Sequence, residues 1–301
     1  MSATRPHRPV LGVSLKLASV VMLSSMSACV KFLGTDMPMG ETIFVRSLIA
    51  VITLALIARF TVGMQVLKTD HWQRHARRSL FGTISMFCLF TALTLIPLAD
   101  VTVIGFTSPM FVTVLAMLFL GERIHAFRWT ALGIGLVGVL IMISPHLHLG
   151  SGQTLGLSAA FAATLFSAIA MIFLRRMSGA EHAITITFYF MLTSMACALL
   201  TLPWGWIVPD GRQLLVLLMT GAFGVLGQLL LSFSYRYAEA STIAPLDYSS
   251  MIMAVLLGYL FFAELPNWSI WFGAPLVMAS GLIIFWREYR LQLLRLRDET
   301  A

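Results

Sequence analysis

The chain has 301 residues, of which 58% are hydrophobic and only 11% are charged, and its net charge is +7. Soluble proteins carry about 25% charged residues, so a soluble domain of this size could not bury so much apolar surface. The composition excludes a disordered chain, a secreted disulfide scaffold and a nucleic-acid-binding protein, and it indicates an all-α polytopic membrane protein.

Apolar runs that could each cross a bilayer, about 20 residues long, recur along the whole chain. They leave no room for an extramembrane domain, and the tightest hairpins between them fall at Pro97 and at Arg236–Glu239. The runs predict ten transmembrane helices, at Val10–Leu33, Gly40–Ala58, Ser79–Ile96, Ala99–Leu120, Phe127–Ile143, Thr154–Leu174, Ala183–Leu202, Leu214–Tyr235, Ala240–Phe262 and Trp268–Trp286.

Lys and Arg are distributed very unevenly over the connecting segments. If the N-terminus is cytoplasmic, the segments on that side hold 16 of these residues, including the basic stretch Lys68–Arg78, and the opposite loops hold only Arg212. The positive-inside rule then places both termini in the cytoplasm. We therefore expect a multi-pass protein of the cytoplasmic (inner) membrane, with a basic cytoplasmic tail at 287–301.

A weak internal repeat divides the chain into two halves. Shifting the sequence by 142 residues places Glu122, at the end of the fourth run, on Glu264, at the end of the ninth. Residues 10–143 and 154–286 would then each form a five-helix repeat. Because five is odd, the second repeat would enter the membrane inverted, an arrangement typical of secondary transporters with a site near the bilayer midplane.

Ionisable residues within the predicted spans are the first candidates for a substrate site, because a charge in hydrocarbon is costly unless it is paired or hydrated. Lys31, Arg46 and Asp247 meet this criterion. Lys16 lies close enough to the inner surface to snorkel, so we expect no role for it. Two structural alternatives stay open: outward snorkelling of Lys31, and pairing of Arg46 with a nearby carboxylate or another helix.

Two prolines indicate where helices are interrupted. Pro109 and Pro245 lie within the fourth and ninth spans, and each leaves backbone carbonyls that must face protein or a wet cavity. We therefore expect these two spans to form cavity walls. The remaining candidate substrate-binding residues carry hydroxyl, amide or aromatic groups: Ser108, Tyr189, Gln228 and Tyr248.

No motif indicates a cofactor, a metal or catalysis. The glycines of residues 133–138 match the dinucleotide fingerprint, but they lie within a predicted span, where close helix packing explains them better. His71 with His75, and His146 with His148, have ligand-like spacing but no Cys, Asp or Glu to complete a metal site. We expect neither metal nor cofactor, and a protein that is not an enzyme.

Short motifs in both halves follow the order of a known transporter family. They are Lys31-Phe-Leu33, Glu41, Arg46, Pro97–Asp100, Ser108-Pro109, Gly121-Glu122, Ala240–Tyr248 and Ala263-Glu264. With these motifs the chain resembles the EamA-type members of the drug/metabolite transporter superfamily. The resemblance implies a carrier whose cavity is built from spans one to four and six to nine.

The functional expectation is a secondary transporter that works by alternating access on a small-molecule substrate. Riboflavin uptake, or uptake of a similar flat and polar ring, ranks first; S-adenosylmethionine uptake and amino-acid or drug export are alternatives. An intramembrane enzyme or a scaffold is the competing class, which is disfavoured because Asp247 has no second deep carboxylate beside it. Beyond the lipid bilayer and the substrate, a homodimer is left open.

The predicted topology can be tested with reporter fusions. Fusions after Lys68 and Arg176 should report the cytoplasm, and fusions after Leu149 and Pro209 should report the external side, as the Lys and Arg distribution requires. An inverted result around Pro97 would remove one hairpin and contradict the two five-helix repeats.

Overall fold

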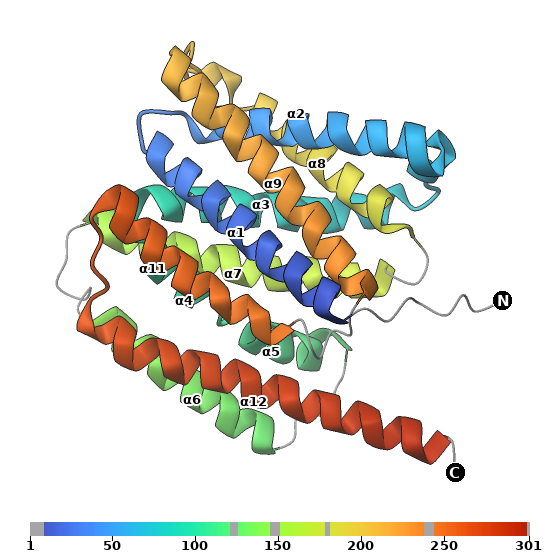
Figure 1. Ribbon diagram of the computed structural model, residues 1–301, viewed down its shortest axis with the longest axis vertical. Helices are drawn as coiled ribbons and strands as arrows, with labels where there is room; N and C mark the ends of the chain where they lie inside the picture. Colours follow the sequence, from blue (N-terminus) through green and yellow to red (C-terminus); the bar gives the residue numbers. More distant parts are fainter. Residues whose placement is uncertain (1–8, 121–125, 145–150, 178–180, 238–243, 300–301) are drawn as a thin grey trace.

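The computed structural model describes residues 9–120, 126–144, 151–177, 181–237 and 244–299, and all regular elements in these ranges are helical (Figure 1). Lipid explains this, because helices satisfy their own backbone hydrogen bonds within hydrocarbon. In the first half the helices are α1 (Pro9–Leu33), α2 (Met39–Ile57), η1 (Ala58–Val62), η2 (Met64–Leu67), α3 (Trp72–Leu95), α4 (Leu98–Gly105), α5 (Ser108–Leu120) and α6 (Ala126–Ile143).

The described residues of the second half also form only helices as regular elements. Its helices are α7 (Ser151–Met177), α8 (Ala183–Leu199), η4 (Leu202–Trp204), α9 (Gly211–Tyr237), η5 (Ala244–Tyr248), α11 (Ser249–Phe262) and α12 (Trp268–Glu299).

The all-helical, multi-pass class predicted from composition is confirmed for the described residues. Six helical stretches are long and apolar enough to cross a membrane, and four shorter apolar helices lie at the remaining predicted spans, in α6, α8, η5 with α11, and α12. The total of ten spans therefore stays a prediction. Several helices are longer than the predicted spans: α3 begins at Trp72, α7 ends at Met177, α9 ends at Tyr237 and α12 ends at Glu299. Arg78, Arg175, Arg176 and Arg236 therefore belong to helices and not to connecting loops.

The fourth predicted span consists of two helices. α4 ends at Gly105 and α5 begins at Ser108, and the Thr107 hydroxyl donates to the carbonyl of Ile104 at 2.6 Å across the break. Pro109 is the second residue of α5, a position at which the missing N–H of proline removes no helical hydrogen bond. In the second half the 3₁₀ turn η5, which contains Pro245, precedes α11.

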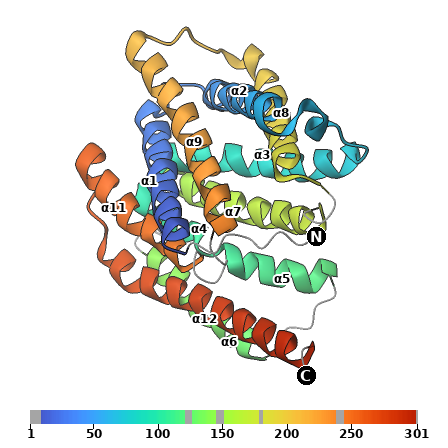
Figure 2. The same cartoon turned by 45° about the vertical axis from the view of Figure 1, so that its right-hand side comes forward.

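The two halves interleave, because the main packed pairs join one helix from each. α1 lies along α9 and α3 lies along α7, while α2 with α8 and α6 with α12 form the two opposite ends of the bundle (Figures 1 and 2). α4 and α11 pack together between α1 and the α6–α12 pair. The largest apolar cluster, around Phe90, Leu93 and Ile43, therefore includes side chains from both halves.

Glycines allow α6 and α12 to approach each other closely. A Cβ at Gly138 would lie 2.8 Å from the backbone oxygen of Gly273, and a Cβ at Gly273 would lie 2.6 Å from that of Gly138. A Cβ at Gly135 would lie 2.7 Å from the Ser280 hydroxyl. The interpretation of residues 133–138 as a helix-packing motif is therefore confirmed at Gly135 and Gly138.

This contact predicts a clear difference between two substitutions on α6. Gly138→Ala should reduce the stability by about 1–3 kcal/mol, because the added methyl group overpacks the contact with α12. Gly133→Ala is the matched control, since no heavy atom lies within 4 Å of a Cβ there. Thermal unfolding of both variants in lipid nanodiscs measures the difference, and equal stability of the two would contradict the close approach.

Candidate functional site

A cavity of about 220 Å³ lies among helices of both halves. Its lining residues come from α1, α2 and α3 of the first half and from α7 and α8 of the second. The polar and aromatic side chains that line it are Arg46, Arg78, Ser85, Phe90, Ser167 and Phe190.

Helical periodicity explains how α3 and α7 form the two longest walls. On α3, Ser85, Met86 and Leu89 follow Gly82 at the three- and four-residue spacing of one helix face. The cavity-lining residues of α7, from Ser167 to Leu174, follow the same spacing. The Ser85 hydroxyl donates to the carbonyl of Ala163 at 2.7 Å, which fixes α3 against α7 beside the cavity.

Arg46 brings a positive charge into the cavity from α2. Its Nη1 is directed at the sulfur of Met86, its Cζ lies 5.7 Å from the ring centroid of Phe90, and its Nε is buried without an acceptor. Glu41, the acidic residue nearest in sequence on the same helix, instead accepts from the backbone N–H of Ile207 at 3.3 Å. The expected alternative of a structural carboxylate partner for Arg46 is therefore not found among the described residues.

Arg78 is the functional candidate that the sequence reasoning missed. Its guanidinium carbon lies 4.2 Å from the ring centroid of Phe190, and its Nε and Nη1 are buried with no hydrogen-bond acceptor. A sequence signal existed, since Arg78, Gly82 and Met86 are spaced by four residues and share a helix face. The sequence analysis placed Arg78 in the basic stretch Lys68–Arg78, outside the predicted spans, and therefore did not consider it as a residue of a helix face.

Lys31 is paired across the two halves. Its Nζ lies 2.8 Å from Oε1 of Glu264 and donates to the carbonyl of Ile96 at 2.7 Å. The other oxygen of Glu264 accepts from the backbone N–H of Leu98 at 3.1 Å. The charge of Lys31 is therefore compensated within the protein, and outward snorkelling is not observed.

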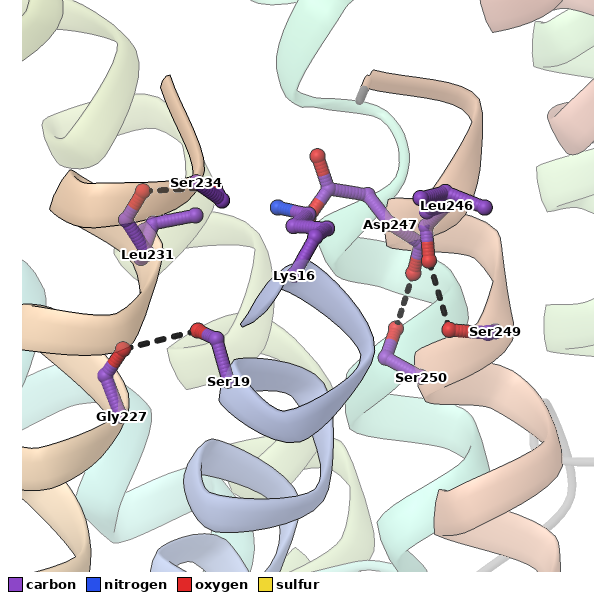
Figure 3. A network of polar contacts seen from close by, with 9 residues as sticks. All are labelled: Lys16, Ser19, Gly227, Leu231, Ser234, Leu246, Asp247, Ser249 and Ser250. Atoms are coloured by element: carbon purple, nitrogen blue, oxygen red, sulfur yellow. Dashed lines mark hydrogen bonds and ion pairs between the residues drawn. The ribbon is translucent and has the colours of Figure 1, made fainter. Parts of the chain in front are cut away.

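Lys16 also pairs with a carboxylate, so the expectation that it snorkels is wrong. Only 2% of Lys16 is exposed, and its Nζ lies 2.5 Å from Oδ1 of Asp247 (Figure 3). Asp247 belongs to η5, just before α11, and its side chain is 54% exposed. One turn away on α1, the Ser19 hydroxyl donates to the carbonyl of Gly227 at 2.8 Å, which holds α1 against α9.

The other predicted site residues lie apart from this cavity. The prediction that the fourth and ninth spans form the cavity walls is also wrong, since no residue of α4, α5, η5 or α11 is among the described lining residues. The Tyr189 hydroxyl donates to the carbonyl of Leu67 at 3.1 Å and its ring packs on His75, while the Tyr248 ring packs on Phe106 with 4.9 Å between centroids. Among the predicted substrate-binding residues, the cavity lining includes only Arg46. Gln228 is exposed on α9, Ser108 and Pro109 begin α5, and the backbone of Pro245 lies in η5.

The candidate metal ligands do not come together in the described ranges. No three His, Cys, Asp or Glu side chains there are placed to hold a metal ion. His75 instead lies 3.7 Å from Glu181. His146, His148 and Glu122 lie outside the described residues.

Comparison with known proteins relates the whole chain to one transporter family. The sequence profile of the EamA-like transporter family matches residues 10–144 and 154–286. A riboflavin transporter of Rhizobium johnstonii is 28% identical, over 96% of this chain and 95% of that protein. The pseudopaline exporter CntI of Pseudomonas aeruginosa is 28% identical over 91% and 93%, and an S-adenosylmethionine uptake transporter of Rickettsia felis is 27% identical over 92% and 93%.

A solved crystal structure shares the fold. It superimposes with a TM-score of 0.65 over 94% of this chain and 99% of the other, at 16% sequence identity. At that identity the similarity concerns the fold alone.

The Lys31–Glu264 pair predicts strong coupling between these two side chains. Lys31→Gln or Glu264→Gln alone should each destabilise the protein, by up to about 3 kcal/mol, because each leaves a poorly hydrated charge without its partner. The double variant should lose clearly less than the sum of the two. Thermal unfolding in nanodiscs measures the coupling, and losses that add to within about 0.5 kcal/mol would show that the two residues do not interact.

Proposed function

The chain belongs to the EamA-like transporter family, and we propose that it is a secondary transporter that moves a small metabolite across the cytoplasmic membrane by alternating access. It is a multi-pass membrane protein, and the names of its relatives indicate a transporter and not an enzyme. The proposal includes cytoplasmic termini and two inverted five-helix units at 10–143 and 154–286.

The observation that carries the proposal is the cavity that both halves enclose. α1, α2 and α3 provide one part of its wall, and α7 and α8 provide the other. Alternating access requires a site between two units that can rock against each other. A cavity within one half would not change its accessibility when the halves move.

The two lysine ion pairs support the same mechanism. Lys16–Asp247 and Lys31–Glu264 lie toward opposite ends of α1, and their acidic partners lie at the two ends of the η5–α11 segment. Opening toward one side of the membrane would require α1 and this segment to separate at that side. We propose that each pair breaks in turn while the other holds.

For the substrate, uptake of riboflavin or a similar flat, polar ring compound ranks first. The rings of Phe90 and Phe190 and the hydroxyls of Ser85 and Ser167 suit a planar molecule with polar edges. S-adenosylmethionine uptake is the second candidate. Lys31 is neutralised by Glu264, but Arg46 and Arg78 line the cavity and would repel the sulfonium of this substrate. Export is the third, since one relative is named as an exporter.

Growth rescue tests the function and the direction together. The chain should restore growth of a riboflavin auxotroph that lacks its own importer, at low external vitamin. Rescue of an S-adenosylmethionine-requiring strain instead would reverse the ranking. If neither strain is rescued and neither compound enters vesicles in either orientation, the proposed function for these substrates fails.

Two phenylalanine substitutions on α7 provide the matched control. Ser167→Phe places a ring inside the cavity and should reduce uptake to background, whereas Ser158→Phe makes the same change at an exposed position outside the cavity and should leave uptake intact. Both variants must reach the membrane in equal amounts. Full uptake by Ser167→Phe would show that the substrate does not pass through this cavity.

A further inference from the structure

The cavity concentrates positive charge. Arg46 enters it from α2 and Arg78 enters it from α3, and the described lining contains no acidic side chain. No carboxylate among the described residues lies within 4.0 Å of either guanidinium. Lys16 and Lys31, by contrast, each lie against a carboxylate.

Three guanidinium nitrogens of these two arginines are also buried without a hydrogen-bond partner. Arg46 Nε and Arg78 Nε and Nη1 are buried without an acceptor, and Met86, which Arg46 Nη1 approaches, offers only a weakly accepting thioether. A guanidinium keeps its charge in proteins, so these groups cannot relieve the cost by losing a proton. A buried donor without a partner destabilises a protein, and a charged donor does so more strongly.

The aromatic contacts compensate only part of this cost. Phe90 and Phe190 each face one guanidinium, at 5.7 and 4.2 Å. A cation–π contact offsets only a small part of the cost of holding a charge within a membrane protein without a counter-charge. The rings orient the guanidiniums, and the missing partner is an anion.

We propose that the transported molecule carries an anionic group, a carboxylate or a phosphate, which binds between Arg46 and Arg78. This inference rests on the proposed transport function and names the substrate class of its site. Forked guanidinium donors match both anions in geometry. The rings of Phe90 and Phe190 lie beside the same space and offer contact to an apolar or planar part of the molecule.

The volume limits what binds there. Pockets for drug-sized ligands usually measure about 300–1,000 Å³, and this one measures about 220 Å³. It holds a small organic anion or the acidic end of a larger one. Among the flat, polar ring compounds proposed as substrates, the two arginines therefore favour one that carries an acidic group, which riboflavin itself does not.

Three small probes of similar shape test the inference on the full chain in nanodiscs: benzoate, phenyl phosphate and the neutral amide benzamide. Benzoate or phenyl phosphate should stabilise the protein against thermal unfolding at a concentration at least about tenfold lower than benzamide, because charge-assisted hydrogen bonds contribute about 1.5–3 kcal/mol each. The stronger of the two acids identifies the preferred anion. If neither acid stabilises better than benzamide, the inference is overturned.

Variants of the two arginines show whether the acids bind at this site. Arg46→Gln and Arg78→Gln should each weaken acid binding about 10- to 100-fold and leave benzamide unaffected. Arg78→Lys should give an intermediate loss, since it keeps the charge but not the fork. Arg77→Gln is the matched control, because Arg77 is the neighbouring residue on α3 but is exposed and outside the cavity. Unchanged acid binding in both Gln variants would overturn the proposal.

A second measurement, the stability of the ligand-free variants, excludes misfolding as the cause of weaker acid binding. Removing an unpaired buried charge should leave the ligand-free protein as stable as the wild type or more stable, whereas a structural arginine would cost stability when removed. Lower ligand-free stability in both Gln variants would therefore contradict the assignment. Riboflavin or S-adenosylmethionine uptake in cells is scored separately, so the transport function can stand when the anion site fails.

Discussion

Hydrocarbon does not compensate a charge. In the described part of the chain, two lysines and two arginines point into the interior, and each needs a partner within the chain or from a ligand. Lys16 and Lys31 find it in Asp247 and Glu264. The guanidiniums of the cavity contact aromatic rings and, for Arg46, the sulfur of Met86, but no described carboxylate. The two lysines are paired with carboxylates and hold helices together. The two arginines have no such partner, and in our proposal they are available to a solute.

The architecture places these two kinds of charge in different parts of the bundle. The lysines are on α1, which lies along α9 and also contacts α11, so their acidic partners come from the other half of the chain. The arginines are on α2 and α3 and line a cavity to which α7 and α8 also contribute. A glycine on α9 leaves room for Arg46. A Cβ at Gly224 would lie 3.1 Å from Arg46 Nε, so a larger residue there would displace the guanidinium.

Much of the fold could be predicted from sequence, but less of the site. Long apolar runs in a chain with few charges predict membrane-spanning helices, because a helix satisfies its own backbone hydrogen bonds in lipid. The structure confirms the helical class. Averaged hydropathy does not report which way a side chain turns, so Arg78 looked like its neighbours Arg74 and Arg77 although it alone of the three lines the cavity. The partner of Lys16, Asp247, lies 231 residues further along the chain, and no local pattern reveals such a contact.

The two lysines lie far apart on α1, so a small tilt of this helix around one of them moves the other by several ångströms. Lys16 and Lys31 are 15 residues apart on one continuous helix, which corresponds to about 22 Å along its axis. A tilt of α1 by about 10° around one ion pair would move the other lysine by about 4 Å, more than a direct hydrogen bond can stretch. In the proposed mechanism, a small rigid-body rotation of α1 would therefore suffice to separate one ion pair while the other holds, without unfolding any part of the helix.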